Sequence, residues 1–318
     1  MSKIVLVTGS SGYIGGQTVL ALKDHGHTVI GVDSLPVPDH LRGVADRAYQ
    51  EDFASNHALE LLHKFDPIAI IHCAGTSLVG PSMTGPDRYY HNNFVKTKTL
   101  LDRLHEINST ARVIFSSSAA VYGNPVMTPC QEVDPTEPIS PYGESKIMIE
   151  WMMRAYSRAH GLDYVALRYF NACGADPKAR HGQRNGATHI IARVLESVRD
   201  RTQFVINGND FETADGTCIR DYVHVSDIAQ AHVEALDRGQ VPGGVYNLGT
   251  AKGASNLEIV AAAEKIVGKK IPVEFGPRRE GDPAVLTASA DKWYQVNGNQ
   301  MQHKLEDMIK HAWQWYTK

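Results

Sequence analysis

The sequence lacks the features that mark membrane and nucleic-acid-binding proteins. No apolar run approaches the roughly 20 residues that a membrane-spanning helix needs. The 32 lysines and arginines are outnumbered by 35 aspartates and glutamates, so the formal net charge is −3. No basic excess therefore favours a nucleic acid. We expect neither a membrane nor a nucleic acid as a partner.

Cysteines are few as well. The chain has four, far apart and without a C-x-x-C pair: Cys73, Cys130, Cys173 and Cys218. This spacing gives no sign of a disulfide framework, so we expect a protein of the reducing cytoplasm. The apolar start Ile4–Val7 is too short for a signal-peptide core and leads directly into a Gly-rich turn. It is therefore predicted to be a buried first strand.

Metal-binding motifs are missing although the chain has 15 histidines. Neither H-E-x-x-H nor a close Cys/His spacing occurs, so we predict no metal site. His224 is interpreted as a structural hydrogen-bonding residue rather than as a ligand.

What the first half of the chain does have is a regular alternation of short β-branched runs and longer amphipathic stretches. Five runs are predicted to be strands: Ile4–Thr8, Thr28–Asp33, Ala69–Ala74, Arg112–Ser117 and Tyr164–Tyr169. Four stretches are predicted to be helices: Tyr13–His25, Ala54–Phe65, Pro86–Glu106 and Tyr142–His160. This alternation indicates an α/β fold with a Rossmann-type doubly wound parallel sheet, covered by helices on both faces.

The second half is less regular. Helices are predicted near four stretches: Thr188–Arg199, Asp227–Asp237, Asn256–Val267 and His303–Tyr316. We expect a dinucleotide-binding domain over residues 1–170, with later contributions near 217–250. Residues 171–318 are expected to form mainly a smaller α+β substrate-binding domain. It would sit over the carboxyl edge of the sheet, where ligands bind in such folds.

A glycine-rich turn joins the first predicted strand to the first predicted helix. Thr8 to Gly15 read T-G-S-S-G-Y-I-G, a G-x-x-G-x-x-G pattern. Gly9 permits the tight turn, Gly12 lets the backbone approach a pyrophosphate, and Gly15 lets helix and strand pack closely. Free N–H groups at the helix start then face the phosphates. The pattern predicts a dinucleotide site.

An acidic residue closes the second predicted strand. Asp33 lies 24 residues after Gly9, where its carboxylate can accept hydrogen bonds from the adenosine ribose. A carboxylate at this position repels a 2′-phosphate. The sequence therefore favours NAD over NADP as the cofactor.

A tyrosine and a lysine stand four residues apart at the start of the fourth predicted helix. Tyr142 and Lys146 thus share one helix face. Upstream, Ser116, Ser117 and Ser118 end a predicted strand. Strand ends and the adjacent helix starts meet at one edge of a parallel sheet, so these side chains are predicted to converge.

The chemistry of such a site requires a base that is active near neutral pH. The pKa of an unperturbed tyrosine is about 10, too high for this role. A cation about 5 Å away, at an effective dielectric constant of about 20, favours the phenolate by roughly 3 kcal/mol, or about two pKa units. We expect Lys146 to supply that charge and a serine hydroxyl to share the proton.

These motifs together resemble the extended short-chain dehydrogenase/reductase family, in particular its UDP-galactose (UDP-glucose) 4-epimerase branch. The resemblance runs from about Lys3 to about Trp315. Beyond the segments already quoted, it is carried by Ile71–Gly75, Asn92-Asn93, Phe115–Gly123, Ser140–Gly143, Arg168–Asn171, Arg220–Val225, Tyr246–Gly249 and Arg278–Asp282.

The resemblance implies a role for each matching position. Tyr142 would be the base, Lys146 its activator and a ribose contact, and Ser118 the hydroxyl partner. Asp52 and Phe53 would lie against the adenine. The full cofactor site would comprise Gly9, Gly12, Tyr13, Ile14, Gly15, Asp33, Ser34, Asp52, Phe53, Ala74, Gly75, Asn92, Ser116, Tyr142, Lys146, Tyr169 and Phe170.

The resemblance likewise implies a site for a UDP-sugar. Its members would be Ser118, Tyr142, Asn171, Thr188, Arg220, Arg279, Asp282 and Leu286. Two guanidinium groups can bind a diphosphate, and a carboxylate can bind ribose hydroxyls. The chain departs from the family pattern at Ser77, where a cofactor-binding lysine is common, and at Thr188, where an asparagine is common.

The implied reaction is a transient oxidation of the sugar. Tyr142 would take the proton of the C4 hydroxyl while hydride passes to NAD. The 4-keto sugar would then turn about its diphosphate linkage and receive the hydride on its other face. Leu286 stands where the family carries a bulky tyrosine or a smaller residue, so some activity on UDP-N-acetylhexosamines is a hypothesis. A plain core leucine is the alternative.

Other activities stay open at this stage. Related 4,6-dehydratases carry a Thr-Asp-Glu set where this chain has Ser118-Ala119-Ala120, which argues against dehydration. A UDP-glucuronate epimerase or decarboxylase is harder to exclude. A non-catalytic NAD-binding regulator would be expected to lack the tyrosine or the lysine, and both are present.

The fourth predicted helix is richer in apolar residues than one core-facing side requires. They are Met148, Ile149, Trp151, Met152 and Met153. In the family this helix and Pro86–Glu106 form the interface of a homodimer, which we expect here. Burial under the second domain is the alternative.

The role assigned to Asp33 gives a first testable prediction. Replacing Asp33 with alanine should weaken NAD binding and narrow the preference for NAD over NADP, because the ribose loses its acceptor and a 2′-phosphate its repulsion. Titration of the purified variant with both dinucleotides measures this. Unchanged affinities for both would remove Asp33 from the site.

Overall fold

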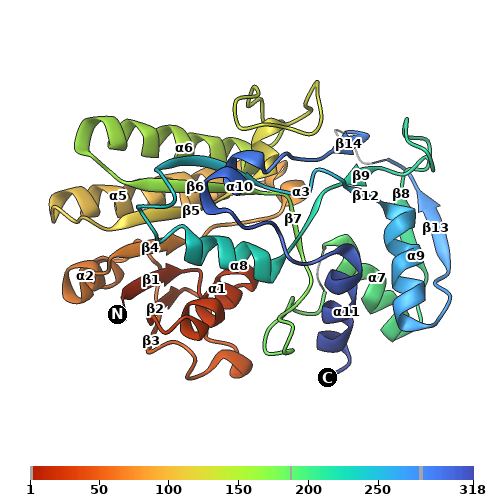
Figure 1. Cartoon of the computed structure of the whole chain (residues 1–318), viewed down its shortest axis with the longest axis horizontal. Coiled ribbons are helices and arrows are strands. Elements are labelled where there is room, and N and C mark those ends of the chain that lie inside the picture. Colours follow the sequence, from red (N-terminus) through yellow and green to blue (C-terminus); the bar gives the residue numbers. More distant parts are fainter. Residues whose placement is uncertain (1–2, 187, 279–281) are drawn as a thin grey trace.

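A seven-stranded parallel sheet forms the centre of one half of the molecule (Figure 1). The computed structural model describes residues 3–186, 188–278 and 282–318. From edge to edge, the strands are β11 (Gly244–Leu248), β6 (Tyr164–Tyr169), β5 (Arg112–Ser118), β4 (Ala69–His72), β1 (Ile4–Thr8), β2 (Thr28–Asp33) and β3 (Arg47–Gln50). Every neighbouring pair is parallel, which confirms the predicted fold class.

The five predicted strands are present with almost the predicted bounds. Their β-branched and aromatic residues are buried along nearly their whole length, as expected for strands covered on both faces. Only the ends differ: β4 stops at His72 and β5 extends to Ser118. The prediction missed the two edge strands, since β3 is polar and mostly exposed and β11 comes 75 residues after β6.

Helices cover both faces of the sheet (Figure 1). On one face α1 (Tyr13–Asp24) packs against α8 (Val225–Glu234), and their apolar sides join the first core cluster. On the other face α2 (Asn56–Phe65), α5 (Lys96–Glu106) and α6 (Pro141–His160) build a second core cluster. Thus α8, from far along the chain, belongs to the sheet's helix layers.

The predicted helix Pro86–Glu106 is wrong in its middle. It divides into α4 (Pro86–Tyr89), a wider π-helical stretch η2 (Tyr90–Val95) and α5. Wider turns of this kind are common at functional sites. Here the stretch carries Asn93, whose buried side-chain amide donates to the carbonyl oxygen of Thr76 and the hydroxyl of Ser145.

The remaining half gathers around a third core cluster. Its helices are α7 (Ile190–Asp200), α9 (Asn256–Val267) and α11 (Leu305–Tyr316), close to the predicted bounds. Its strands pair as β8 (Phe204–Asn207) with β13 (Val273–Gly276), β7 (Asn171–Cys173) with β10 (Tyr222–His224), and β12 (Ala254–Ser255) with β9 (Ile219–Arg220) and β14 (Val285–Leu286).

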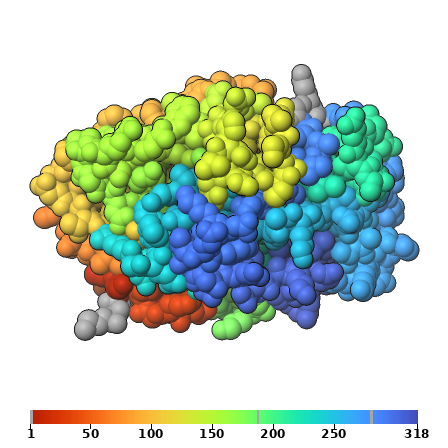
Figure 2. Space-filling model, turned by 45° about the horizontal axis from the view of Figure 1, so that its top comes forward, coloured from red at the N-terminus to blue at the C-terminus, as the bar shows by residue number. Residues whose placement is uncertain are grey.

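Four short helices complete the chain. Three lie within the sheet half, η1 (Asp39–Leu41) between β2 and β3, α3 (Val79–Ser82) after β4 and η3 (Ala119–Tyr122) after β5, and α10 (Asp291–Asn297) lies between β14 and α11. Figure 2 shows the blue C-terminal segment against the yellow loop that precedes α6. There Cys130 bonds through its backbone to Thr287 and Ser289. Within the described ranges, no helix is long and apolar enough to cross a membrane.

Candidate active site at the carboxyl edge of the sheet

The turn between β1 and α1 has the geometry of a phosphate-binding loop. Gly9 adopts φ +71°, which side chains other than glycine rarely accept. A Cβ atom at Gly15 would lie only 2.1 Å from the carbonyl oxygen of Gly9, so helix and turn touch without room for a side chain. No side chain caps the N-terminus of α1, and its first turn holds no acid. Its amides can therefore bind the pyrophosphate of a dinucleotide.

Asp33 ties this turn to the end of β2. Its carboxylate accepts hydrogen bonds from the backbone N–H groups of Ser11, at 2.9 Å, and Leu35, at 2.8 Å. Ser34 beside it is exposed. The Tyr13 hydroxyl donates to the carbonyl oxygen of Gly174 at 2.7 Å, which joins α1 to the second half of the chain.

The predicted adenine contacts lie beyond β3. Asp52 pairs with Lys96 at 2.5 Å, and the Phe53 ring lies 4.8 Å from the ring of His72. Burial lowers the pKa of His72 to about 3, so this histidine is neutral. Both predicted residues are half-buried. Their contact with adenine stays a prediction.

After β4, Thr76 is linked through Asn93 to Ser145 in the first turns of α6. The side chain of Asn92 donates to the Thr76 hydroxyl at 3.0 Å. Asn93 lies deeper: its side-chain oxygen accepts from the Thr76 N–H at 2.7 Å and would lie 2.9 Å from a Cβ atom at Gly75. Sequence reasoning named Asn92 as the cofactor contact and missed the structural role of Asn93, although the Asn-Asn pair was part of the motif.

Tyr142, Lys146 and Ser118 converge at the carboxyl end of β5. The helix α6 begins with Ser140 as its N-cap, whose hydroxyl accepts from the N–H of Gly143 at 3.2 Å. The Lys146 ammonium donates to the carbonyl oxygen of Ser116 at 2.9 Å and lies 5.7 Å from the centre of the Tyr142 ring. The Ser118 hydroxyl hydrogen-bonds the Tyr142 side chain.

The electrostatics of this pair differ from the expectation. Burial raises the pKa of Tyr142, only partly offset by its hydrogen bond with Ser118. Burial also lowers the pKa of Lys146 to about 8, although interactions with Cys73 and with the carboxylate of Glu150 oppose this shift. Lys146 still carries most of its charge at pH 7. The protein alone therefore does not lower the pKa of Tyr142. The expectation that Lys146 would lower it is wrong for the polypeptide without further positive charge in the site.

Ser116 and Tyr169 form a buried polar group beside the lysine. The Ser116 hydroxyl lies 3.1 Å from Cys73 Sγ and 3.2 Å from His232 Nε2, and it hydrogen-bonds Tyr169. Phe170 is also buried, in the fourth core cluster. Ala74 is half-buried, and its N–H donates to the hydroxyl of Thr8. All the predicted residues of this region thus gather at one edge of the sheet.

The predicted substrate residues come from several segments of the second half. Arg220 is largely buried; one terminal nitrogen binds the carbonyl oxygen of Ile219, and the other lies 3.5 Å from Asp282 without a hydrogen-bond partner among the described residues. Asn171 donates to the carbonyl oxygen of Asp221 at 2.8 Å. An unsatisfied buried guanidinium nitrogen is suited to binding an anionic ligand.

Leu286, Thr188 and Arg279 are the other residues predicted for the substrate site from the second half of the chain. Leu286, on β14, packs against the fourth core cluster, which contains residues of η3, Ile147 of α6 and Phe170. Thr188 precedes α7 and is exposed, as is Ser77. Arg279 lies outside the described residues.

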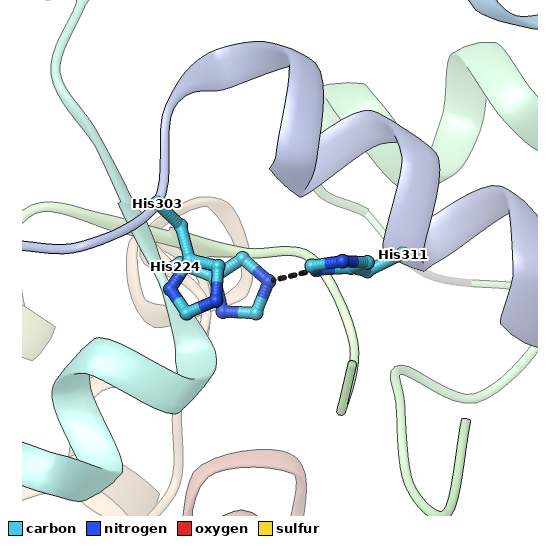
Figure 3. Close-up of side chains that lie close together, drawn as sticks. All are labelled: His224, His303 and His311. Atoms are coloured by element: carbon cyan, nitrogen blue, oxygen red, sulfur yellow. Dashed lines mark hydrogen bonds between the residues drawn. The ribbon is translucent and has the colours of Figure 1, made fainter. Parts of the chain in front are cut away.

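Three histidines meet away from this site, between α8 and α11 (Figure 3). The N–H of Ser226 donates to His224 Nδ1 at 3.0 Å, so the hydrogen of the neutral ring is on Nε2, which faces His311 Nδ1 at 3.0 Å. His303 bonds Asp227 at 2.8 Å. Its ring stacks on His224 at 4.0 Å and 22°.

This geometry favours hydrogen bonding over metal ligation. A ligating imidazole offers a bare nitrogen, whereas His224 Nε2 carries a hydrogen. An ion bound by His224 and His303 would also have to lie in two nearly parallel ring planes. The cluster therefore links α8 to α11 through hydrogen bonds. Sequence spacing could not reveal it, because His224 lies about 80 residues from the other two.

The fold and the site define a dinucleotide-binding α/β enzyme with a tyrosine–lysine pair. A family model described as the NAD dependent epimerase/dehydratase family matches residues 5–249. The chain belongs to this family, and NAD, predicted from the turn and Asp33, is thereby confirmed as its cofactor.

Individual relatives are similar over nearly the whole chain. A UDP-glucose 4-epimerase of Halalkalibacterium halodurans is 43% identical, over 99% of this chain and 96% of the relative. The structure of UDP-glucose 4-epimerase from Bifidobacterium longum in complex with NAD+ and UDP is 34% identical with a TM-score of 0.91, covering 99% and 98% of the two chains. That of the UDP-Glc/GlcNAc 4-epimerase from Campylobacter jejuni is 33% identical with a TM-score of 0.84, covering 99% of each.

Proposed function

We propose that the protein is an NAD-dependent 4-epimerase that interconverts UDP-glucose and UDP-galactose. The observation that carries the proposal is the meeting of Tyr142, Lys146 and Ser118 at the end of β5, above the dinucleotide turn. Relatives with this printed activity, 37–43% identical over at least 97% of this chain, support it.

Tyr142 acts as the base in this proposal. Its phenol oxygen takes the proton of the C4 hydroxyl, Ser118 shares the hydrogen bond, and the carbonyl of Ser116 holds the Lys146 ammonium beside them. When bound, NAD supplies the acceptor for the C4 hydride, returns it later, and adds a positive ring that favours the phenolate. The oxidised C4 then presents its other face, and Tyr142 gives the proton back as the hydride returns.

The UDP part is held by the second half of the chain. Arg220, with its unsatisfied nitrogen, is suited to the diphosphate, and we assign Arg279 to the same task. We assign Asp282, Asn171 and Thr188 to the ribose and uracil of the UDP moiety. We assign Ser116, Tyr169 and Phe170 to the nicotinamide end of the cofactor site.

The proposal includes a cytoplasmic location and a homodimer. All four cysteines are free, which fits a reducing compartment. On α6, Ile149 and Met153 face the core, whereas Trp151 is 50% exposed. Figure 1 shows α5 and α6 on the side away from α7, α9 and α11, which supports an interface with a second copy over burial under the second domain.

The assignment of Tyr142 as the base predicts the effect of removing its hydroxyl group. Tyr142→Phe should lower turnover of UDP-glucose at least 100-fold, since a general base is worth about 10²–10⁴ in rate, and leave NAD binding within about twofold. Turnover is measured as product formation without added NAD, and NAD binding is measured by titration. Tyr156→Phe, which removes a hydroxyl on the same helix bonded to Asp102, is the control and should stay near the parent rate. Near-normal turnover of Tyr142→Phe would end the base assignment.

Leu286 sets a second prediction, on substrate size. If it borders the sugar, the protein converts UDP-N-acetylglucosamine as well as UDP-glucose, and Leu286→Tyr should reduce the former activity at least tenfold more than the latter, because the ring crowds the acetamido group. Leu286→Met, of similar volume, should leave the ratio of the two activities unchanged. Absence of any activity on the acetylated sugar in the parent protein would contradict the idea.

The exposed face of α6 predicts the state of association. Light scattering at micromolar concentration should give the mass of two chains, and Trp151→Glu should shift it to one, because a buried carboxylate without a partner is costly. Lys269→Glu, at an exposed position just after α9 and outside both predicted interface helices, serves as the control. A single-chain mass for the parent protein would count against the dimer.

A further inference from the structure

Glu150 is the third polar residue in the row that Tyr142 and Lys146 begin along α6. Tyr142, Lys146 and Glu150 follow at intervals of four, so they occupy one helix face. Each contacts a different one of the three serines that end β5. Ser118 bonds Tyr142, the carbonyl of Ser116 binds Lys146, and the Ser117 hydroxyl donates to Glu150 at 2.5 Å.

Glu150 belongs to a fully bonded ion pair inside the protein. Arg168, on β6, donates to its two carboxylate oxygens from Nε at 3.0 Å and from Nη2 at 2.6 Å. The side chains are 3% and 5% exposed, so both charges are desolvated. Arg168 also donates to the hydroxyl of Tyr122 at 2.9 Å, and that hydroxyl donates to Asn247 at 2.7 Å. The network ties α6, β5, β6, η3 and β11 together.

Stability alone is a poor explanation for these buried charges. Desolvation of such a pair costs about as much as the attraction returns, and apolar replacements of similar volume are often as stable. The neighbouring Ile147, Ile149 and Met153 already anchor α6 in apolar clusters. A bidentate ion pair adds what apolar contacts do not, a defined rotation and depth of the helix.

Glu150 also acts on the charge of Lys146. The groups that face Lys146 are Cys73 after β4, the neutral His72, Tyr142 and Glu150. Burial lowers the pKa of Lys146 to about 8, and Glu150 is the carboxylate that opposes this shift.

We propose that Glu150, held by Arg168 and Ser117, is a positioning residue for the reaction: it fixes α6 against β5 and supports the charge of the Lys146 ammonium. The inference rests on the proposed function, because it assigns Lys146 and Tyr142 their catalytic roles. Glu150 itself touches neither substrate nor cofactor in this proposal; it acts through Lys146.

The pH profile of turnover separates this role from a structural one. Activity requires the ammonium, so it falls as pH rises through the pKa of Lys146. Glu150→Gln removes the opposing charge, lowers that pKa further, and should move the alkaline limb of kcat to lower pH by on the order of one unit. It should also reduce kcat about tenfold at pH 7.5 with KM for UDP-glucose within about twofold. Glu150→Asp keeps the charge but is too short to keep the contacts, so it should lower kcat with little movement of the limb.

A second arginine–carboxylate pair, between the buried Arg112 and the partly exposed Asp163, provides the control. Arg112, at the start of β5, donates to Asp163 through two bonds of 2.9 Å, at the opposite end of the strand from Lys146. Asp163→Asn should lower the melting temperature and leave the pH profile of kcat in place. Because Glu150→Gln leaves Arg168 unpaired, the double variant Glu150→Gln/Arg168→Gln is made alongside it and should show the same direction of shift.

The outcomes distinguish the two proposals. A parent-like pH profile in folded Glu150→Gln and in the double variant overturns the positioning role, and so does failure of both to fold, which makes the pair structural. If Tyr142→Phe is inactive while Glu150→Gln behaves like the parent protein, only this inference fails. If Tyr142→Phe turns over normally, the proposed function fails first.

Discussion

The bond between the Lys146 ammonium and the carbonyl oxygen of Ser116 is the contact on which the site depends. It joins the first turns of α6 to the end of β5, and thereby sets where Tyr142 and Ser118 stand. A buried ammonium needs such partners, since burial works against its charge. The same burial raises the pKa of Tyr142, so the site keeps a neutral phenol until further positive charge arrives. In the proposed mechanism, the positive charge of a bound nicotinamide would therefore help to convert this phenol into the base.

The parallel sheet explains why these groups meet. All seven strands run the same way, so the glycine turn after β1, Asp33 at the end of β2, Gly75 after β4 and the serines of β5 open on one edge. The positive end of α1 lies at that edge too. The second half of the chain contributes Arg220 and Leu286 on strands that pair with each other, β9 and β14. One edge therefore collects groups spread over more than 270 residues.

Much of the fold was predictable because its signals are local. Buried parallel strands are continuous apolar runs. The helix α9 has its predicted bounds, and local features mark both of its ends: the Ser255 capping box and Gly268. The edge strand β3 was missed since it is polar, and the break at η2 was missed since it depends on where the amide of Asn93 finds its partners. Neither feature has a periodic pattern of its own.

The sequence by itself determined the order of strands and helices, the glycine turn and the four-residue spacing of Tyr142, Lys146 and Glu150, because these depend on neighbours along the chain. Only the tertiary structure decided which of them act together. The ion pair of Glu150 with Arg168, the link of His224 to His311 and the raised pKa of Tyr142 arise from burial and from contacts between distant segments. Desolvation and long-range contacts are properties of packing, and no local pattern encodes them.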